Sequence, residues 1–161
     1  LEEVDLRGAN LEQCNFTDAL MGNSCLAGIR GTHGIFLRAD CYGVDFNEAE
    51  LCGAIMVEAH LSGATLVRAN LRQALLMRAN CCGADFSGAD LTYADLSHAN
   101  VSDGNYDAAE MFRTKLHQAQ ASGVQFSDGA RALGDDEALL AAERWQPTEV
   151  QFAADVEGDR G

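Results

Sequence analysis

The chain has 161 residues, with 25 acidic and 11 basic side chains, a net charge of −14 and a pI near 4.4. This charge argues against non-specific attraction to phosphate backbones, so direct nucleic-acid binding is not expected. The sequence contains nothing near the roughly 18 consecutive apolar residues of a membrane span, and its acidic start lacks the basic segment of a signal peptide.

A five-residue period begins at Leu6 and runs through most of the chain. Every fifth residue from there to Phe126 is a centre with a sizeable apolar side chain, except Gly31 and Ala121. Two residues before each centre lies a small residue, which is alanine eleven times in succession over 49–99. Asp and Asn are favoured just before the centre. A period of five fits neither a helix nor an ordinary strand.

This pattern resembles the pentapeptide-repeat family, whose consensus is A(D/N)LXX, over residues 4–128. The resemblance implies an all-β fold, a right-handed quadrilateral β-helix of about six coils in which four pentapeptides make one coil. It also implies that the centre and the small residue point inward and the other three positions outward. Burial of each central side chain is worth roughly 1.5–3 kcal/mol, which helps a narrow tube to offset its ordering entropy.

We expect a repeat domain over 1–129 and a capping helix and tail over 130–161. Acids precede a run of helix formers, and Pro147 follows it, which predicts a helix over 136–145. This helix would cover the last coil, or alternatively form a dimer interface. The candidate plugs are Leu139, Ala142 and Trp145. The chain begins without Met and already in repeat phase, which suggests a segment of a longer protein.

The weakest stretch of the repeat is 29–35. Gly31 stands at a centre, and Gly34 stands at the next small inward position. The sequence leaves two interpretations open here: one degenerate repeat, or a local bulge or loop used for contact.

No catalytic, cofactor or metal site is expected. The four histidines are assigned to different sides or distant coils, and no Cys/His spacing suits zinc. A convex tube filled with its own side chains offers no pocket in which a carboxyl pKa could be raised for acid–base chemistry. The six cysteines are interpreted as small apolar residues in a reducing, bacterial cytoplasm. They are Cys14, Cys25, Cys41, Cys52, Cys81 and Cys82.

A twenty-residue coil stacks the outward residues into columns, and one side carries unexpected apolar residues. On three successive coils, the residues before and after the centre are apolar, and the next outward column alternates in charge. An apolar cluster with a charged rim is typical of a protein contact. The candidate partner-binding residues are Ile35, Leu37, Arg38, Ile55, Val57, Glu58, Leu75, Met77 and Arg78.

Three explanations of this cluster stay open at the sequence level. It binds another protein or a second copy of the chain, a remote segment of the chain covers it, or its residues reflect strand propensity alone. The leading hypothesis is a non-catalytic interaction scaffold whose partner is another protein, with a homodimer as a further option.

Two narrower functions are suggested by resemblance. Some family members inhibit or protect DNA gyrase by imitating duplex DNA. Residues 1–129 hold 17 acids and 8 bases. The resemblance therefore gives, as the alternative function, a DNA-mimicking inhibitor or protector of DNA gyrase or another topoisomerase. The stretches 109–117 and 132–137 look like repeat domains of proteins encoded with bacterial type VI secretion systems, which would suggest an adaptor for secretion effectors.

Overall fold

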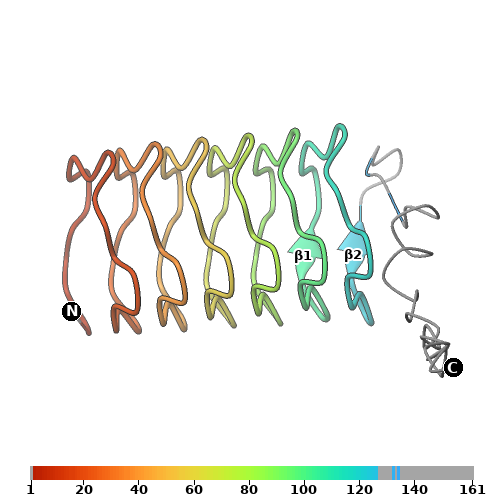
Figure 1. The fold of residues 1–161 in the computed structure, drawn as a ribbon, viewed down its shortest axis with the longest axis horizontal. Coiled ribbons are helices and arrows are strands. Elements are labelled where there is room, and N and C mark those ends of the chain that lie inside the picture. Colours follow the sequence, from red (N-terminus) through yellow and green to blue (C-terminus); the bar gives the residue numbers. More distant parts are fainter. Residues whose placement is uncertain (1, 127–131, 133, 135–161) are drawn as a thin grey trace, which may run out of the picture.

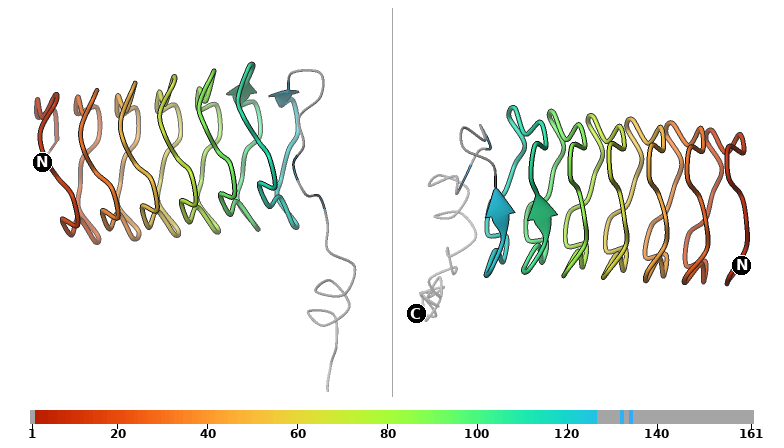
Figure 2. Two further views of the ribbon diagram at one scale, coloured as in Figure 1. Left: turned by 90° about the horizontal axis from the view of Figure 1, so that it is seen from above. Right: turned by 180° about the vertical axis from the view of Figure 1, so that it is seen from behind.

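In the computed structural model, the described residues are 2–126, 132 and 134. The backbone winds through flat coils stacked along one long axis, with residue 2 at one end and residue 126 at the other (Figures 1 and 2). Parallel bridges join residues 20 apart, from Asp5↔Cys25 to Asn100↔Gln120. At the far end, β1 (Asn105–Tyr106) pairs in parallel with β2 (Gln125–Phe126). Four pentapeptides therefore complete each coil and form a four-sided tube.

Each pentapeptide uses its backbone N–H groups in the same way, as residues 64–68 illustrate. The N–H of Ala64 closes the preceding turn on Leu61 O, at 3.0 Å. The N–H of Thr65 bonds to the preceding coil, and those of Leu66 and Arg68 bond to the following coil, at 2.7–3.0 Å. The remaining N–H, one residue after the centre, has no backbone acceptor in this scheme. The turn and the neighbouring coils together thus satisfy four of every five backbone donors.

The turns share one backbone conformation. The second residue after each centre has a positive φ of 51–68°, at every fifth position from Glu3 to Gly123. With a hydrogen bond from the fourth residue to the first, this is the φ pattern of a type II turn. Most of these positions are not glycine, although a positive φ is costly for other residues. The cost is tolerated because coil stacking and the buried centre both require the turn.

The interior consists of the centres and the small residues. Leu51, Leu61, Leu66 and Leu71 are fully buried, as is every alanine of the series 49–99 to within 1%. Each wall lies only about one side chain from the tube axis. A small alanine two residues before the centre therefore leaves the room that the central side chain needs. The inward orientation predicted for the centres and small residues is therefore confirmed from 36 to 101.

Aromatic centres stack along the tube axis and impose local demands. The Phe86 and Tyr106 rings lie 4.8 Å apart and nearly parallel, with Phe126 next at 5.5 Å. A Cβ atom on Gly104 would lie 2.8 Å from Tyr106 Cε2 and 3.0 Å from Val101 O. Glycine therefore replaces the usual alanine where a tyrosine occupies the next centre.

The stretch 29–35 is a degenerate repeat and contains no bulge. Bridges Asn10↔Arg30 and Arg30↔Glu50 continue through it without a shift in register. Ile29 is fully buried, and its Cδ1 lies 3.3 Å from where a Cβ of Gly31 would be. The large and small inward residues have exchanged places, so the interior remains filled.

The predicted helix over 136–145 lies outside the described residues, as does nearly all of the predicted second domain over 130–161. Within the described residues the secondary structure consists of bridges, turns, β1 and β2, with no helix. Among these residues no helix is long and apolar enough to cross a membrane.

Replacement of Gly104 by alanine tests the packing around Tyr106. We expect Gly104→Ala to lower the free energy of unfolding by about 1–3 kcal/mol, because the new Cβ overpacks the ring. The double variant Gly104→Ala/Tyr106→Leu restores the repeat consensus and should recover most of the loss. Urea denaturation measures both. Gly22→Ala is the control, since its Cβ would meet only Tyr42 O at 3.7 Å. Additive effects in the double variant would contradict the packing account.

Burial divides the cysteines into two classes. Cys41 and Cys81 are fully buried centres, and burial raises the pKa of each thiol to about 12. The other four are partly exposed. We expect a thiol-reactive reagent at pH 8 to label Cys14, Cys25, Cys52 and Cys82 in the native protein, and all six after denaturation. Peptide mapping by mass spectrometry reads the sites. Rapid native labelling of Cys41 or Cys81 would show that the interior is not closed.

Candidate protein-binding face

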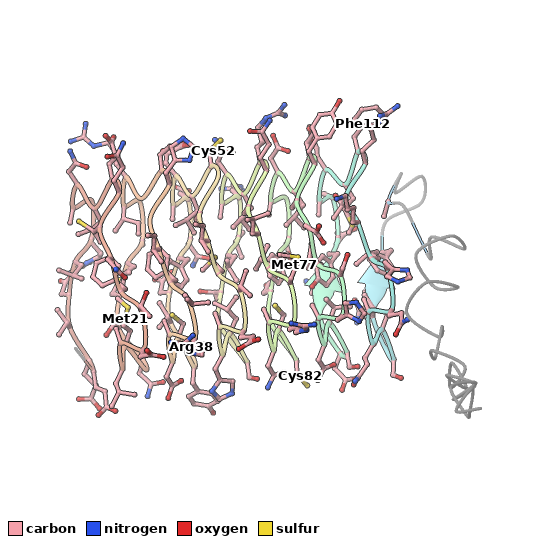
Figure 3. All side chains as sticks on the ribbon, viewed as in Figure 1. Met21, Arg38, Cys52, Met77, Cys82 and Phe112 are labelled. Atoms are coloured by element: carbon pink, nitrogen blue, oxygen red, sulfur yellow. The ribbon has the colours of Figure 1, made fainter. Side chains whose placement is uncertain are left out.

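The twenty-residue period sorts the outward residues onto four faces, which we number by their first centre. Face 1 follows Leu6, face 2 Leu11, face 3 Phe16 and face 4 Met21, each continuing every 20 residues. Figure 3 shows Cys52 and Phe112, both of face 2, along one edge of the tube and Cys82, of face 4, along the opposite edge. Met77 lies between these edges, on face 3.

The apolar residues of face 3 form a continuous strip. Bridges Ile35↔Ile55 and Ile55↔Leu75 stack the first column, and the second column contains Leu37, Val57 and Met77. Leu75 is 36% exposed, whereas the other five are only partly exposed. The outward positions of these six residues in the repeat predict that all of them are exposed. They are less so because neighbouring coils, about 4.8 Å away, cover the sides of each side chain.

The sequence preference for Asp and Asn before each centre has a specific structural cause. In twelve repeats the side-chain Oδ1 accepts a hydrogen bond from the N–H two residues later, at 2.9–3.3 Å. This N–H is the one that the coil stack leaves without a backbone acceptor. On face 3, Asn15 and Asp95 bond in this way to Thr17 and Ser97.

The apolar strip lacks this hydrogen bond on three successive coils. Ile35, Ile55 and Leu75 replace the Asp or Asn. Within the described part of the chain, nothing accepts a hydrogen bond from the N–H of Leu37 or Val57, nor from that of Met77. With Asn as the acceptor, hydrogen bonds of this kind contribute about 0.5–1.5 kcal/mol each. The strip therefore replaces a recurrent stabilising contact with apolar surface.

A ladder of alternating charge borders the strip. The second residues after the face 3 centres are, in order, Asp18, Arg38, Glu58 and Arg78. Arg38 donates to both carboxylate oxygens of Asp18 at 2.7 Å, and Arg78 Nη1 lies 3.9 Å from Glu58 Oε1. The hydrogen bond from Arg38 lowers the pKa of the Asp18 carboxyl below its usual value. The Asp18–Arg38 pair of the ladder thus stays charged over the physiological pH range.

Two of the histidines are closer together than the sequence suggested. His98 and His117 lie on successive coils of face 3, with ring centroids 5.5 Å apart and planes nearly perpendicular. Their separation onto distant coils was therefore wrong. The second residue after one centre lies beside the first residue after the centre 20 positions later. Within the described residues, no three His, Cys, Asp or Glu side chains come together as metal ligands.

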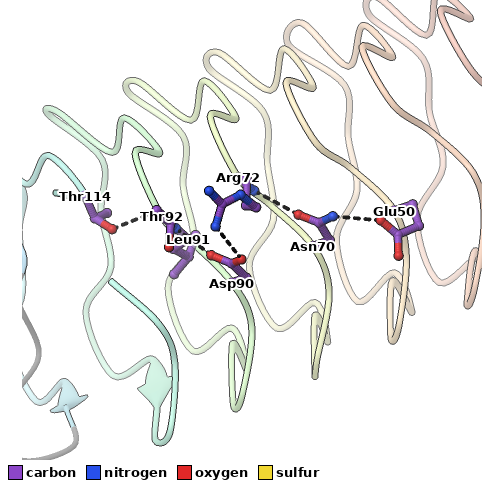
Figure 4. Close-up of polar contacts among 7 residues, drawn as sticks. All are labelled: Glu50, Asn70, Arg72, Asp90, Leu91, Thr92 and Thr114. Atoms are coloured by element: carbon purple, nitrogen blue, oxygen red, sulfur yellow. Dashed lines mark hydrogen bonds and ion pairs between the residues drawn. The ribbon is translucent and has the colours of Figure 1, made fainter. Parts of the chain in front are cut away.

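Face 2 shows what an ordinary polar face looks like. Asn70 Nδ2 donates to Glu50 Oε2 at 2.8 Å, and Arg72 Nη1 donates to Asp90 Oδ2 at 3.1 Å (Figure 4). Along this face, polar side chains bond to one another from coil to coil. The strip on face 3 has no such series of polar contacts from coil to coil. Polar residues resume on the next coil, where Asp95 follows Leu75 in the same column.

The structure also shows exposed aromatic side chains that the sequence analysis did not single out. Tyr93 and Phe112 stack edge to face on face 2, with centroids 5.8 Å apart, and are 46% and 43% exposed. Tyr42, on face 4, is 52% exposed and contacts His60. Their signal in the sequence is an aromatic residue at an outward position, although none of the three belongs to a pair of apolar residues that flank a centre.

The fold and the repeat define a class, the five-residue-repeat β-helices with outward-facing columns. The family described as Pentapeptide repeats matches residues 1–30, 35–73 and 69–105, in eight copies. The chain belongs to the pentapeptide-repeat family. Proteins of this family form right-handed quadrilateral β-helices.

Several solved structures are similar to this chain. A pentapeptide repeat protein from the Arabidopsis thaliana thylakoid lumen is 30% identical, with 60% of this chain and 68% of that chain covered and a TM-score of 0.59. Full-length QnrB1, a plasmid-mediated fluoroquinolone resistance protein, is 15% identical, with 89% and 98% covered and a TM-score of 0.43. A pentapeptide repeat protein from Nostoc PCC 7120 is 22% identical, with 81% and 84% covered and a TM-score of 0.28. No curated protein matched the sequence.

Replacement of Ile55 by asparagine separates the strip from the core. We expect Ile55→Asn to change the free energy of unfolding by less than about 1 kcal/mol, since a new hydrogen bond to the Val57 N–H offsets the lost apolar contact. Met56→Ala, one residue away but inside the tube, should cost about 2–5 kcal/mol. Urea denaturation compares them. Equal losses would mean that Ile55 serves mainly to hold the fold.

Proposed function

We propose that the protein is a non-catalytic interaction scaffold that binds protein through the apolar strip of face 3. The observation that carries the proposal is the replacement of Asp or Asn on three successive coils. At these positions the fold has a stabilising polar residue available, and the chain carries Ile or Leu instead. Because the exchange is close to neutral in stability, stability does not require Ile or Leu at all three positions, whereas an apolar binding surface does.

The shape of the strip suits a protein partner. Two apolar columns over three coils form a continuous surface, with the charge ladder along one edge. Apolar centres with polar or charged rims are characteristic of protein interfaces, where the rim sets orientation and the apolar part excludes water. The convex tube keeps these side chains at fixed spacing, so little ordering entropy is lost on binding.

The proposed location is a reducing bacterial cytoplasm. The support is the set of six cysteines, none paired in the structure, of which four are partly exposed. Partly exposed thiols would oxidise or exchange in an oxidising compartment. An adaptor for secretion effectors is a narrower form of the same proposal. It depends on the resemblance of residues 109–117 and 132–137 to repeat domains of proteins encoded with bacterial type VI secretion systems.

Topoisomerase inhibition by imitation of DNA is the second candidate, and the distribution of charge is what favours it. Faces 1 and 4 form adjoining sides of the tube, with nine acids and two arginines over residues 2–126. Both arginines are paired there, Arg7 with Asp5 at 2.7 Å and Arg68 with Glu48 at 3.7 Å. Faces 2 and 3 do not share this acidity, so only the two adjoining sides formed by faces 1 and 4 could imitate DNA.

Ile55→Asn tests the scaffold proposal. We expect the wild-type protein to retain its partner in a pull-down at 0.5 M salt, because apolar contact resists screening, and Ile55→Asn to lose it. Leu20→Asn is the matched control. Leu20 occupies the same repeat position on face 4 and is 57% exposed, but lies outside the strip. Its replacement should leave binding intact.

Two outcomes would contradict the scaffold proposal. The first is that Ile55→Asn changes neither the captured proteins nor the oligomeric state. The second is that the protein inhibits gyrase supercoiling at low salt, that added salt abolishes the inhibition, and that Ile55→Asn leaves it unchanged. The second outcome would support the topoisomerase alternative.

A further inference from the structure

Face 3 is the one side of the tube that is electrically balanced within residues 2–126. It carries three acidic and three basic side chains. Face 1 carries five acidic and two basic side chains, face 2 carries four acidic and three basic ones, and face 4 carries four acidic and no basic ones. Two copies of a chain with net charge −14 repel each other on approach. Face 3 is therefore the surface on which a second copy meets the least net repulsion.

The charge ladder on this face is complementary to itself when reversed. Read along the tube it is acid, base, acid, base, at Asp18, Arg38, Glu58 and Arg78. A second copy turned end for end presents base, acid, base, acid. Asp18 of each copy then faces Arg78 of the other, and Arg38 faces Glu58. Because both copies have the same coil spacing, all four positions stay matched along the interface.

The ladder residues have capacity for such contacts. The side chains of Arg78 and Glu58 are 67% and 45% exposed, and their 3.9 Å separation makes a loose pair. Arg38 is 48% exposed although it is bonded to Asp18. Exposed pairs of this kind contribute little within one chain. Between two copies, partial loss of solvent would strengthen them.

We propose that the partner of the strip is a second copy of this chain, in an antiparallel dimer with face 3 against face 3. The proposal rests on the proposed function and names its partner. The two-fold axis lies in the interface, midway between the coils of Phe36 and Met56. Ile35 of one copy then packs against Ile55 of the other, and Leu37 against Val57.

Other registers of the same face are less favourable. If the axis passes through the coil of Met56, all three apolar rows of one copy face apolar rows of the other. This register, however, places Arg38 opposite Arg78, and Glu58 opposite Glu58 of the second copy. A parallel arrangement places the charge ladder opposite the apolar column of Ile35 and Ile55. Like charges brought face to face, or charges buried against apolar groups, are penalised, so the ladder selects the antiparallel register.

Charge reversal tests both the face and the register. Glu58→Arg alone places arginine opposite Arg38 in a dimer of identical copies, and Arg38→Glu alone places glutamate opposite Glu58. We expect each variant to form a homodimer at least tenfold more weakly than the wild type. Mixed together, they present only opposite charges to each other and should form a heterodimer of wild-type strength. Analytical ultracentrifugation with one copy fluorescently labelled measures this.

We expect the two variants and their control to keep the fold. Glutamate occurs at the same turn position in Glu48, and arginine in Arg68, both with positive φ. Glu48→Arg on face 1 is the matched control and should leave the dimer unchanged.

The outcomes separate this inference from the proposed function. A monomeric wild type at all concentrations overturns the dimer, while loss of another captured protein in Ile55→Asn would leave the scaffold proposal standing. A dimer that Ile55→Asn disrupts but that both charge variants still form alone overturns the antiparallel register. A dimer that Ile55→Asn does not disrupt overturns the assignment to face 3.

Discussion

The structure depends on a single constraint: one apolar side chain must be buried at every fifth residue inside a tube that has no room for a second. Each turn brings a centre inward, and coil stacking then supplies backbone partners above and below it. The alanine two residues earlier is part of the same fit, as Gly104 shows when Tyr106 needs more room. Loss of the period at any point would expose a centre and unpair backbone groups on two neighbouring coils.

The period also governs how function can be distributed. Because 20 residues return the chain to the same side, each outward position becomes a column with fixed spacing along the tube. Residues that lie together in one column of the surface are therefore 20 apart in the sequence. The four faces differ in charge although they share one fold, and the apolar strip appears on one face without disturbing the other three. The proposed function uses only the exterior, since the centres fill the interior.

The hydrogen bonds from Asp and Asn connect the fold to the proposed binding face. They provide an acceptor for the one backbone N–H that the coil stack does not use. Where Ile35, Ile55 and Leu75 take their place, the backbone geometry is unchanged, as the bridges through these residues show. The tube tolerates the exchange because stacking and central burial contribute most of its stability. The exterior is consequently free to vary, and a scaffold can acquire a binding strip at small cost.

The sequence by itself determined the period, the inward and outward positions and the columns, because each follows from a local pattern repeated without a slip in phase. It also placed Ile55 and its neighbours on one face. Only the tertiary structure decided between a bulge and a degenerate repeat at Gly31, since that depends on Ile29 filling the missing volume. It likewise decided how far the strip is covered and that His98 meets His117. Those features arise from contacts between side chains that are distant in the sequence. The five-residue period gives no distances between such side chains.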